Sequence, residues 1–397
     1  MTPKRDLIVI GGGLIGLATA YQFLKQNPSK QVIVLEKETA VCQHQSGRNS
    51  GVLHSGIYYT PGTHKAAMSL AGKAMMQQFL DEEQLPYDLC GKVIVAKSEE
   101  EFPALDKIFQ NGTANGVECE MIGQERLKEI EPHCNGIKAI HVPQSGIADY
   151  PAVANRLAEK IEQMGGEVCT QTRVLSIDER ADEAVVLTEK GAFNGQQVVA
   201  CAGLYSDRVA KMSAPDEVKA QIVPFRGEYY QLKPHAEHLC KGLIYPVPDP
   251  RFPFLGVHFT KMVEGGVDCG PNAVLALARE GYTWGVFNGS DLWESLTYSG
   301  FQRLALKYWR YGLGEMWRSF SKAAFVKALQ GLIPEITAED LEPHPAGVRA
   351  QALTPKGEMV YDFDFVSSNR VLHVVNAPSP AATASLYFGK HIVEKLG

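Results

Sequence analysis

The sequence predicts an α/β fold made of two interleaved domains. Three observations support this prediction: an apolar strand and a glycine-rich turn near the start of the chain, a return to alternating strands and helices after residue 146, and strand-rich stretches in between. The chain has 397 residues, enough for two or three domains, and 45% of them are hydrophobic. With 21% charged residues, this composition excludes a disordered or fibrous protein.

The first forty residues follow the order strand, glycine-rich turn, helix, strand. Residues 7–10 are apolar, as in a buried parallel strand, and a G-x-G-x-x-G motif follows at Gly11, Gly13 and Gly16. Gly11 allows a tight turn, Gly13 lets backbone approach a pyrophosphate, and Gly16 lets helix pack on strand. The pattern therefore predicts a Rossmann-like, dinucleotide-binding unit.

An acidic side chain closes this unit. Residues 31–35 form the second strand, and Glu36 stands at its end, 20 residues after Gly16. A carboxylate at this position can accept hydrogen bonds from ribose hydroxyls. The same charge disfavours NADP, because the 2′-phosphate would meet it.

The rest of the chain alternates between two kinds of pattern. A long, glycine-studded segment at 42–62 is expected to contact a ligand, because so long a structureless segment in a compact domain is usually functional. Helices are predicted near 63–83, 151–164 and 291–330, and mainly antiparallel strands over 221–280. Residues 346–397 are expected to hold a glycine- and proline-rich pair of loops and a terminal helix. The alternation assigns 1–90, 146–220 and 341–397 to the first domain, and 91–145 and 221–340 to an α+β domain on a mostly antiparallel sheet.

The net charge and the cysteines limit which cellular compartment and which binding partners are expected. The 39 basic and 45 acidic side chains give a formal net charge of −6, which disfavours a nucleic-acid partner. The eight cysteines contain no C-x-x-C pair, and no metal site is expected. Residues 7–24 carry no charge, but the glycine motif interrupts them and argues against an export signal. We therefore expect reduced thiols and a cytoplasmic location.

Several further blocks resemble one group of flavoenzymes. These blocks are residues 46–59, 224–229, 244–260, 270–272, 345–351 and 376–383. Essentially end to end, the chain resembles the flavin-dependent D-amino-acid-oxidase superfamily, which includes glycine oxidase, sarcosine oxidase and glycerol-3-phosphate dehydrogenase. Within it, the chain is similar to the L-2-hydroxyglutarate dehydrogenase/oxidase family. The first domain is then expected to bind FAD and the second to bind the substrate.

The resemblance also implies which residues contact FAD. The expected contacts are Gly11, Gly13, Gly16, Glu36, Lys37, Ser46, Arg48, Asn49, Ser50, Gly51, Val174, Ala202, Gly203, Gly347, Ser379, Pro380 and Ala381. One position departs from the family, which often has histidine where this chain has Arg48. An arginine cannot tether flavin, so we expect FAD to be bound non-covalently.

The implied chemistry is oxidation of L-2-hydroxyglutarate to 2-oxoglutarate. The C2 hydrogen leaves as hydride to flavin N5, and the hydroxyl proton needs a base, for which histidine is the natural candidate. His54 and His258 are the two candidates, and the sequence does not choose between them. Either could equally be a hydrogen-bonded structural histidine.

The substrate is a small dicarboxylate, so two cationic receptors are expected. Arginine matches a carboxylate with two parallel hydrogen bonds, and Arg226 and Arg349 are the candidates. Structural ion pairs are the competing interpretation for both. Tyr58 and Tyr245 are expected to shape the pocket.

Residues 301–330 are locally basic, with six basic side chains and one acidic, a balance of +5. Two interpretations stay open. One is an amphipathic membrane-surface element on the inner face of the membrane, suited to passing electrons to a quinone. The other is a pair of helices with a solvated basic face, which Gly312 and Gly314 favour because they interrupt the helical pattern.

Three other functions are less consistent with the motifs. An amine oxidase acting on glycine or sarcosine, the main alternative, needs only one carboxylate anchor. A non-catalytic flavin-binding protein leaves the histidine and arginine blocks without a role. An NAD-dependent dehydrogenase leaves the 42–62 segment without one. The electron acceptor, oxygen or quinone, and the oligomeric state stay open.

Overall fold

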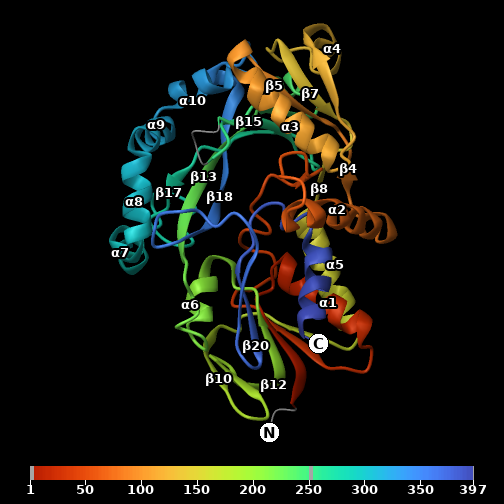
Figure 1. Cartoon of the computed structure of the whole chain (residues 1–397), viewed down its shortest axis with the longest axis vertical. Coiled ribbons are helices and arrows are strands. Elements are labelled where there is room, and N and C mark those ends of the chain that lie inside the picture. The colour runs from red at the N-terminus through yellow and green to blue at the C-terminus, as the bar shows by residue number, and fades with distance from the viewer. Residues whose placement is uncertain (1–3, 250–253, 397) are drawn as a thin grey trace.

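The computed structural model describes residues 4–249 and 254–396. Within this range the strands form sheets of eight, nine and three strands. Figure 1 shows the eight-stranded sheet at one end of the molecule, near both termini, and the nine-stranded sheet toward the other end. The predicted α/β fold is confirmed.

The first sheet is a parallel core with an antiparallel flank. Its parallel strands are β9 (Glu167–Cys169), β2 (Val32–Leu35), β1 (Arg5–Ile10), β12 (Gly191–Ala200) and β20 (Val371–Asn376), in that order. β10 (Val174–Glu179), β11 (Ala184–Thr188) and β19 (Asp364–Ser367) add antiparallel pairs. β1 and β2 are buried along almost their whole length, as parallel strands covered on both faces are.

Three helices pack together against one face of this sheet. They are α1 (Leu14–Gln26), α5 (Tyr150–Gln163) and α11 (Ser385–Leu396), and they lie side by side in Figure 1. The side chain of Asp149 caps α5 by accepting from the backbone of Ala152, and proline occupies its first turn. Small residues bring α11 against α1, since a Cβ on Gly389 would lie 2.6 Å from the backbone of Ala18.

The second sheet is mostly antiparallel. In order it contains β17 (Val274–Leu275), β13 (Gln221–Leu232), β16 (Val267–Gly270), β15 (His258–Lys261), β14 (Leu243–Pro246), β5 (Lys92–Ala96), β7 (Lys138–Val142) and β6 (Glu120–Gly123), with β18 (Leu341–Leu353) beside β13. One face packs on apolar residues of α10 and forms a separate core. The other face carries Tyr245 and turns toward Val52 and Ile147 of the three-stranded sheet.

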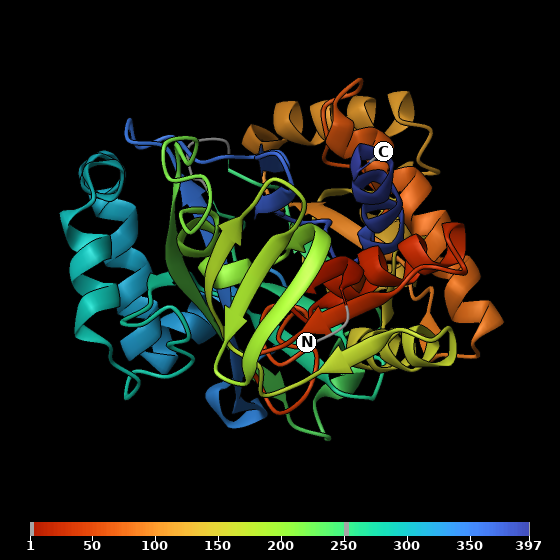
Figure 2. The same cartoon turned by 90° about the horizontal axis from the view of Figure 1, so that it is seen from below.

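The third sheet and the remaining short elements connect the two larger sheets. It consists of β3 (Val52–Leu53), β8 (Gly146–Ala148) and β4 (Tyr87–Asp88). Of the other helices, α2 (His64–Glu82) packs on α11, α3 (Phe102–Ala114) and α4 (Gln124–Ile130) pack on β7, and α6 (Ser206–Ala210) packs on β20. Figure 2, seen from below, places α2 and the C-terminal helix on the opposite side of the molecule from α7–α10.

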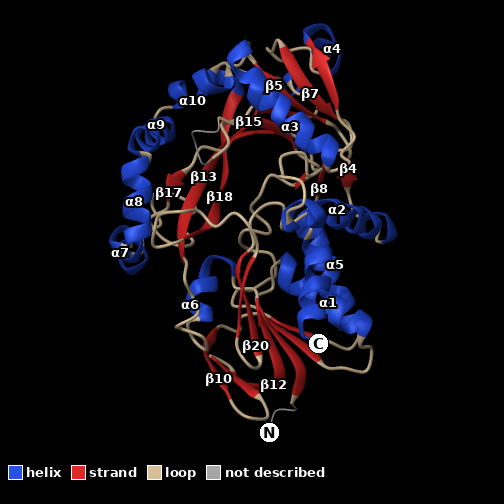
Figure 3. Ribbon diagram, viewed as in Figure 1, coloured by secondary structure: helices blue, strands red, loops and turns tan. Residues whose placement is uncertain are grey.

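A row of helices borders the nine-stranded sheet on its outer side. These are α7 (Gly289–Thr297), α8 (Ser299–Lys307), α9 (Trp309–Phe320) and α10 (Lys322–Leu329), as Figure 3 shows in blue. We call residues 284–330 the helical arm. The helices predicted over 291–330 are confirmed, but the expected interruption is wrong: Gly312 and Gly314 lie inside α9, in open space.

One prediction about the C-terminal part also needs correction. Residues 346–353, expected as a loop, belong to the long strand β18, which pairs with β13 along most of its length. β18 is therefore part of the second sheet, whereas residues 341–397 were assigned to the first domain. No helix in the part of the chain that the structure describes is long and apolar enough to cross a membrane.

Candidate active site

The glycine-rich turn joins β1 to the start of α1. Gly11 has a φ of 108°, and a Cβ there would lie 2.4 Å from the carbonyl oxygen of Cys201. A Cβ on Gly16 would lie 2.0 Å from the carbonyl oxygen of Gly11. Gly13 differs, because its nearest neighbour would be the hydroxyl of Ser46 at 3.0 Å. Two of the glycines therefore serve packing, while Gly13 keeps the N-terminus of α1 approachable.

Glu36 holds this turn from the end of β2. Its carboxylate accepts hydrogen bonds from the backbone N–H of Gly12 at 2.7 Å and of Glu38 at 2.8 Å. The side chain is buried, and each oxygen keeps a free lone pair. The predicted contact to a ribose stays a prediction, but the carboxylate lies where the motif requires it.

Lys37 points into a small charged cluster beside the turn. Its ammonium lies 2.5 Å from Glu280 Oε1 and 3.0 Å from His44 Nε2, and it also pairs with Glu38. Glu38, His44 and Glu280 have the spacing of three metal ligands. Because a lysine ammonium already lies among them, the cluster acts here as an ion-pair network.

The 42–62 segment passes over the N-terminus of α1 and is held by its own polar side chains. Ser46 Oγ accepts from the backbone N–H of Leu14 at 3.0 Å. Asn49 donates to the carbonyl oxygen of Ser46 at 2.7 Å and accepts from the N–H of Gly51 at 2.9 Å. Gly51 adopts a φ of 65° that favours glycine.

Later parts of the chain converge on this segment. A Cβ on Gly347 would lie 2.5 Å from the carbonyl oxygen of Arg48, and one on Gly203 would lie 3.1 Å from Gln45 Oε1. The Arg48 guanidinium lies 4.2 Å from the ring centroid of Tyr282. Ser379 Oγ lies 3.2 Å from His54 Nε2. Residues from positions 11 to 379 thus meet around the 42–62 segment, as a bound dinucleotide requires.

The other expected cofactor residues lie around this meeting point or at the edge of the first sheet. Ala202 precedes the short helical turn that begins at Gly203. The carbonyl oxygens of Pro378 and Pro380 accept from the N–H groups of Ala381 and Ala384. Val174 begins β10 and pairs with Thr188. The glycine-rich turn, the open N-terminus of α1 and the close approaches at Gly203 and Gly347 together fit a dinucleotide cofactor.

The two candidate bases are both held in apolar surroundings. Burial lowers the pKa of His54 to about 3 and that of His258 to about 4, so both imidazoles are neutral at pH 7. His258 Nδ1 lies 3.0 Å from the carbonyl oxygen of Gly256. A carbonyl only accepts, so the hydrogen is on Nδ1 and the lone pair is on Nε2. His54 faces a hydroxyl, which leaves its tautomer free.

The predicted tyrosines lie beside these imidazoles. The Tyr245 ring is 4.0 Å from the His258 ring, centroid to centroid. Burial raises the pKa of Tyr245 to about 12 and raises that of Tyr58 as well, so both stay protonated. Tyr58 Oη is buried and has no hydrogen-bond partner among the described residues. Ser50, in the middle of the 42–62 segment, is a hydrogen-bond partner of Tyr245.

The two predicted arginines do not come together. Phe225 pairs with Arg349, and Arg226 pairs with Val348, so the two arginine side chains point to opposite faces of the sheet. Arg226 is fully buried, lies 2.9 Å from Glu228 Oε1 and stacks on Trp284. Substrate binding by Arg226 therefore stays a prediction that this geometry does not favour, because Arg226 forms an ion pair with Glu228 on the face opposite Arg349.

Arg349 keeps the environment that a receptor needs. Its guanidinium lies 5.3 Å from the ring centroid of Phe254, and no carboxylate of the described residues pairs with it. It lies two residues after Gly347, which contacts Arg48 of the 42–62 segment. Its charge lowers the pKa of His258, so the two side chains are within electrostatic reach.

Two buried charged residues on this face were not predicted. Lys92 opens β5 and is 2% exposed, and burial lowers its pKa to about 7. Asp268 in β16 is 4% exposed, and burial raises its pKa to about 7. In the sequence, each of these residues is a single charged position within an otherwise apolar strand. A search for motifs does not detect such a position.

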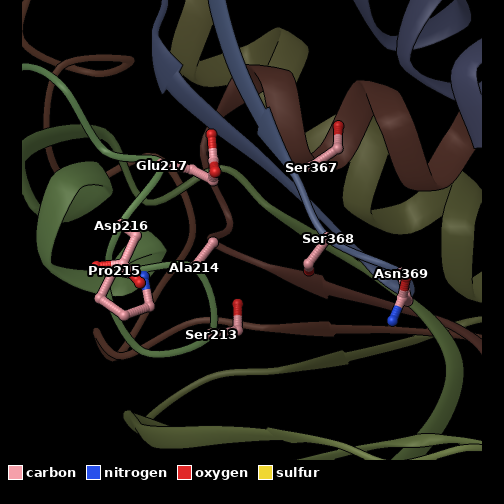
Figure 4. Close-up of a pocket in the computed structure, with 8 residues that line it drawn as sticks. All are labelled: Ser213, Ala214, Pro215, Asp216, Glu217, Ser367, Ser368 and Asn369. Carbon is pink, nitrogen blue, oxygen red and sulfur yellow. The ribbon is translucent and has the colours of Figure 1, made fainter.

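A separate hollow of about 320 Å³ lies between the segment after α6 and the turn between β19 and β20 (Figure 4). It is lined by Ser213, Ala214, Pro215, Asp216, Glu217, Ser367, Ser368 and Asn369. None of the predicted site residues lies in it, and its two carboxylates would repel an anionic substrate.

The family assignment follows from the comparison with known proteins. The family model described as FAD dependent oxidoreductase (DAO) matches residues 6–395. The chain belongs to this FAD-dependent oxidoreductase family. The predicted superfamily and its cofactor are thereby confirmed, and the glycine-lined cradle described above suits FAD.

Relatives of this FAD-dependent oxidoreductase carry a more specific name. An L-2-hydroxyglutarate dehydrogenase of Indibacter alkaliphilus is 48% identical over 390 residues, 98% of each chain. The Escherichia coli K12 protein of the same name is 43% identical over 98% of this chain and 93% of its own. The human mitochondrial one is 44% identical over 100% of this chain and 89% of its own.

Solved structures support the fold. An FAD-bound L-α-glycerophosphate oxidase from Mycoplasma pneumoniae superposes with a TM-score of 0.80 at 23% identity, covering 100% of this chain and 95% of its own. Glycine oxidase from Geobacillus kaustophilus gives 0.73 at 17% identity, covering 100% and 96%. At these identities the likeness concerns the fold alone.

Proposed function

We propose that this FAD-dependent oxidoreductase oxidises L-2-hydroxyglutarate to 2-oxoglutarate. The observation that carries the proposal is a neutral His258 with its Nε2 lone pair free, within electrostatic reach of the guanidinium of Arg349. A 2-hydroxy acid needs a base for its hydroxyl and a cation for its carboxylate. Relatives 43–48% identical bear the name of this activity, which supports the choice of substrate.

The protein side chains have separate tasks in this proposal. His258 Nε2 accepts the proton of the C2 hydroxyl, while the carbonyl of Gly256 fixes the tautomer. Arg349 binds the adjacent carboxylate. FAD, when bound, takes up the hydride from C2. His54, bonded to Ser379, positions the flavin-side loop.

The cofactor would be held by the residues that meet around the 42–62 segment. Gly13 and the start of α1 would receive the pyrophosphate, and Glu36 the ribose. Gly347 and the 379–381 turn would border the ring. Arg48 offers no group that can tether flavin, which supports non-covalent binding.

An anaerobic mixing experiment tests the substrate. Purified holoenzyme is mixed with L- or D-2-hydroxyglutarate, glycine or sarcosine, and flavin absorbance is followed near about 450 nm. The expected result is bleaching with the L-hydroxy acid alone. Bleaching by glycine or sarcosine, and not by L-2-hydroxyglutarate, would favour an amine oxidase and contradict the proposal.

We infer in addition that the helical arm contacts an anionic membrane surface. All four tryptophans of the chain lie on the arm, 36–71% exposed. They are joined by other exposed apolar side chains: Val286, Phe287, Leu296, Leu306, Leu313, Met316 and Phe320. Isolated exposed apolar residues are ordinary, but a soluble surface rarely gathers so many. Arg303, Lys307, Arg310 and Arg318 add positive charge to the same helices.

This contact supports a quinone as the electron acceptor, because quinones reside in the membrane. A liposome flotation assay tests it with vesicles of zwitterionic lipid, with and without about a third of anionic lipid. We expect the wild-type protein to float with anionic vesicles, and Trp293→Ser/Trp317→Ser to float much less. Tyr361→Ser, an exposed aromatic residue outside the arm, is the control. Absence of wild-type flotation would end the membrane proposal.

A further inference from the structure

Lys92 is a buried cation without an anionic partner. It is 2% exposed, and its ammonium lies 4.1 Å from the ring centroid of Tyr245 and 5.7 Å from that of Tyr58. Among the described residues no carboxylate forms an ion pair with it. Burial lowers the pKa of Lys92 to about 7. An ammonium in this position is stabilised by aromatic faces alone, so it is poised to receive an anion.

Three other deeply buried cations among the described residues have partners. Arg279, 2% exposed, pairs with Asp207 at 2.5 Å, and Arg226 pairs with Glu228 at 2.9 Å. Lys73, 6% exposed, donates to the carbonyl oxygen of Gln144 at 2.5 Å. Lys92 is thus an exception among these buried cations, because each of the other three has a partner. The exception points to a ligand rather than to packing.

A second unsatisfied group lies beside it. Tyr58 Oη is buried and has no hydrogen-bond partner among the described residues. Buried hydroxyl groups are normally hydrogen-bonded, and an orphan among them calls for a missing partner. A carboxylate between Lys92 and Tyr58 would satisfy both, because it accepts from an ammonium and from a phenol.

The sheet register places Lys92 on the same face as the proposed base. Leu243 of β14 pairs with Lys92 on one side and with Thr260 on the other. The alternation of side chains then puts Lys92, Tyr245 and His258 on one face. Both Lys92 and Arg349 lower the pKa of His258 by their charge. His258 therefore lies within electrostatic reach of two cations, Lys92 and Arg349.

We propose that Lys92, assisted by the hydroxyl of Tyr58, binds the carboxylate of the substrate that is remote from the reacting carbon, while Arg349 binds the carboxylate next to it. Lys92 then takes the place that the sequence suggested for Arg226. It makes the site selective for dicarboxylates. This inference rests on the proposed oxidation of a 2-hydroxy dicarboxylate.

The ends of the substrate are assigned by the position of the cofactor cradle. Arg349 is two residues from Gly347, which contacts Arg48 of the 42–62 segment, so it lies at the flavin side. Lys92 lies on β5, beyond β14, β15, β16 and β13 from the strand of Arg349. Its ammonium is next to the ring of Tyr58, which lies in the later part of the 42–62 segment, ten residues after Arg48. The reacting carbon therefore belongs at the Arg349 end.

Ligand binding tests the role of Lys92 without turnover. Holoenzyme is titrated with glutarate and with pentanoate, which has a methyl group in place of one carboxylate, and binding is followed by the flavin spectrum. In the wild type, glutarate is expected to bind on the order of 100-fold more tightly than pentanoate. In Lys92→Met this ratio should collapse to within a few-fold of one. Lys92→Arg should restore part of it.

The control is Lys73→Met, which removes another buried ammonium outside the pocket and should keep the wild-type ratio. An unchanged ratio in Lys92→Met would overturn the proposal. So would a loss of FAD content, or an equal weakening of both ligands, since either would mean that Lys92 holds the cofactor or the fold. The substrate proposal is tested separately, by whether L-2-hydroxyglutarate bleaches the wild-type flavin.

Discussion

His258 is buried and His54 is partly buried, and the two differ in what their ring nitrogens can do. The carbonyl of Gly256 forces the hydrogen of His258 onto Nδ1 and leaves Nε2 as an acceptor. Ser379 Oγ, in contrast, can donate to or accept from His54. The sequence predicted both residues and could not rank them, because a neighbouring carbonyl two residues away is not visible as a motif.

Exchange of each histidine for glutamine should separate them. We expect His258→Gln to lower the rate of flavin reduction by L-2-hydroxyglutarate by about 10²–10⁴-fold, because the proton acceptor is lost. His54→Gln should lower it by about tenfold or less, with stopped-flow absorbance as the measurement. Equal losses in the two variants would contradict the assignment.

The pH dependence gives a second check on His258. Burial lowers its pKa to about 4, and the protonated imidazole, which predominates below that value, cannot accept a proton. At saturating substrate, and below pH 7 where Lys92 is protonated, the reduction rate of the wild type should therefore stay level down to about pH 5 and decline only near pH 4. An acid limb near the ordinary histidine pKa of about 6.5 would exclude it.

Arg226 illustrates why residue roles were only partly predictable. Its residue type and its place after a proline favoured substrate binding, but its direction depends on strand register. A shift of one residue turns a side chain to the other face of a sheet. Lys92 was missed for the related reason that its isolation depends on which strands flank β5, and these come from distant parts of the chain.

Sequence patterns predicted the helices and strands best where the chain is locally regular. The strand, turn, helix and strand of the first forty residues were predicted closely, because their periodicity and glycines are contiguous. β18 was mistaken for a loop on account of Pro343, Pro345 and Gly347. Prolines are tolerated there because β18 pairs on one side only, with β13. Edge position is a tertiary property that the local sequence does not carry.

Helix α9 provides a prediction at this scale. Gly312 and Gly314 are helical, and a Cβ at either would meet nothing within 4 Å. Each exchange to alanine should stabilise the protein by about 0.5–1 kcal/mol, since alanine loses less backbone entropy in a helix. Thermal unfolding monitored by circular dichroism measures this, with Gly389→Ala as a contrast that should destabilise because its Cβ would strike α1. A lower melting temperature for Gly312→Ala would mean that α9 needs its flexibility.

At the scale of the whole molecule, the cofactor cradle is assembled from segments that are far apart in sequence. Gly13, Gly51, Gly203, Gly347 and Ser379 come from five such segments. Their contacts all lead to the 42–62 segment, which is a loop with little secondary structure. The interleaving could be predicted from the return of the β–α–β pattern. The course of the loop could not, since it is determined by packing.

Removal of FAD should therefore lower the stability of the whole protein. A ligand present at 100 times its dissociation constant stabilises the native state by about 2.7 kcal/mol. We expect the apoprotein to unfold several degrees lower than the holoenzyme and to regain this on addition of FAD. Differential scanning fluorimetry across FAD concentrations measures the shift. A melting temperature that does not respond to FAD would show that the native protein does not bind it.

The packing of α11 on α1 has a consequence for biosynthesis. The surface of Ala18 is covered by Gly389, which leaves the ribosome only after some 370 further residues. At about 5–20 residues per second, the first βαβ unit waits tens of seconds with an apolar helix face uncovered. The nascent chain therefore cannot complete its cofactor domain until α11 has been synthesised.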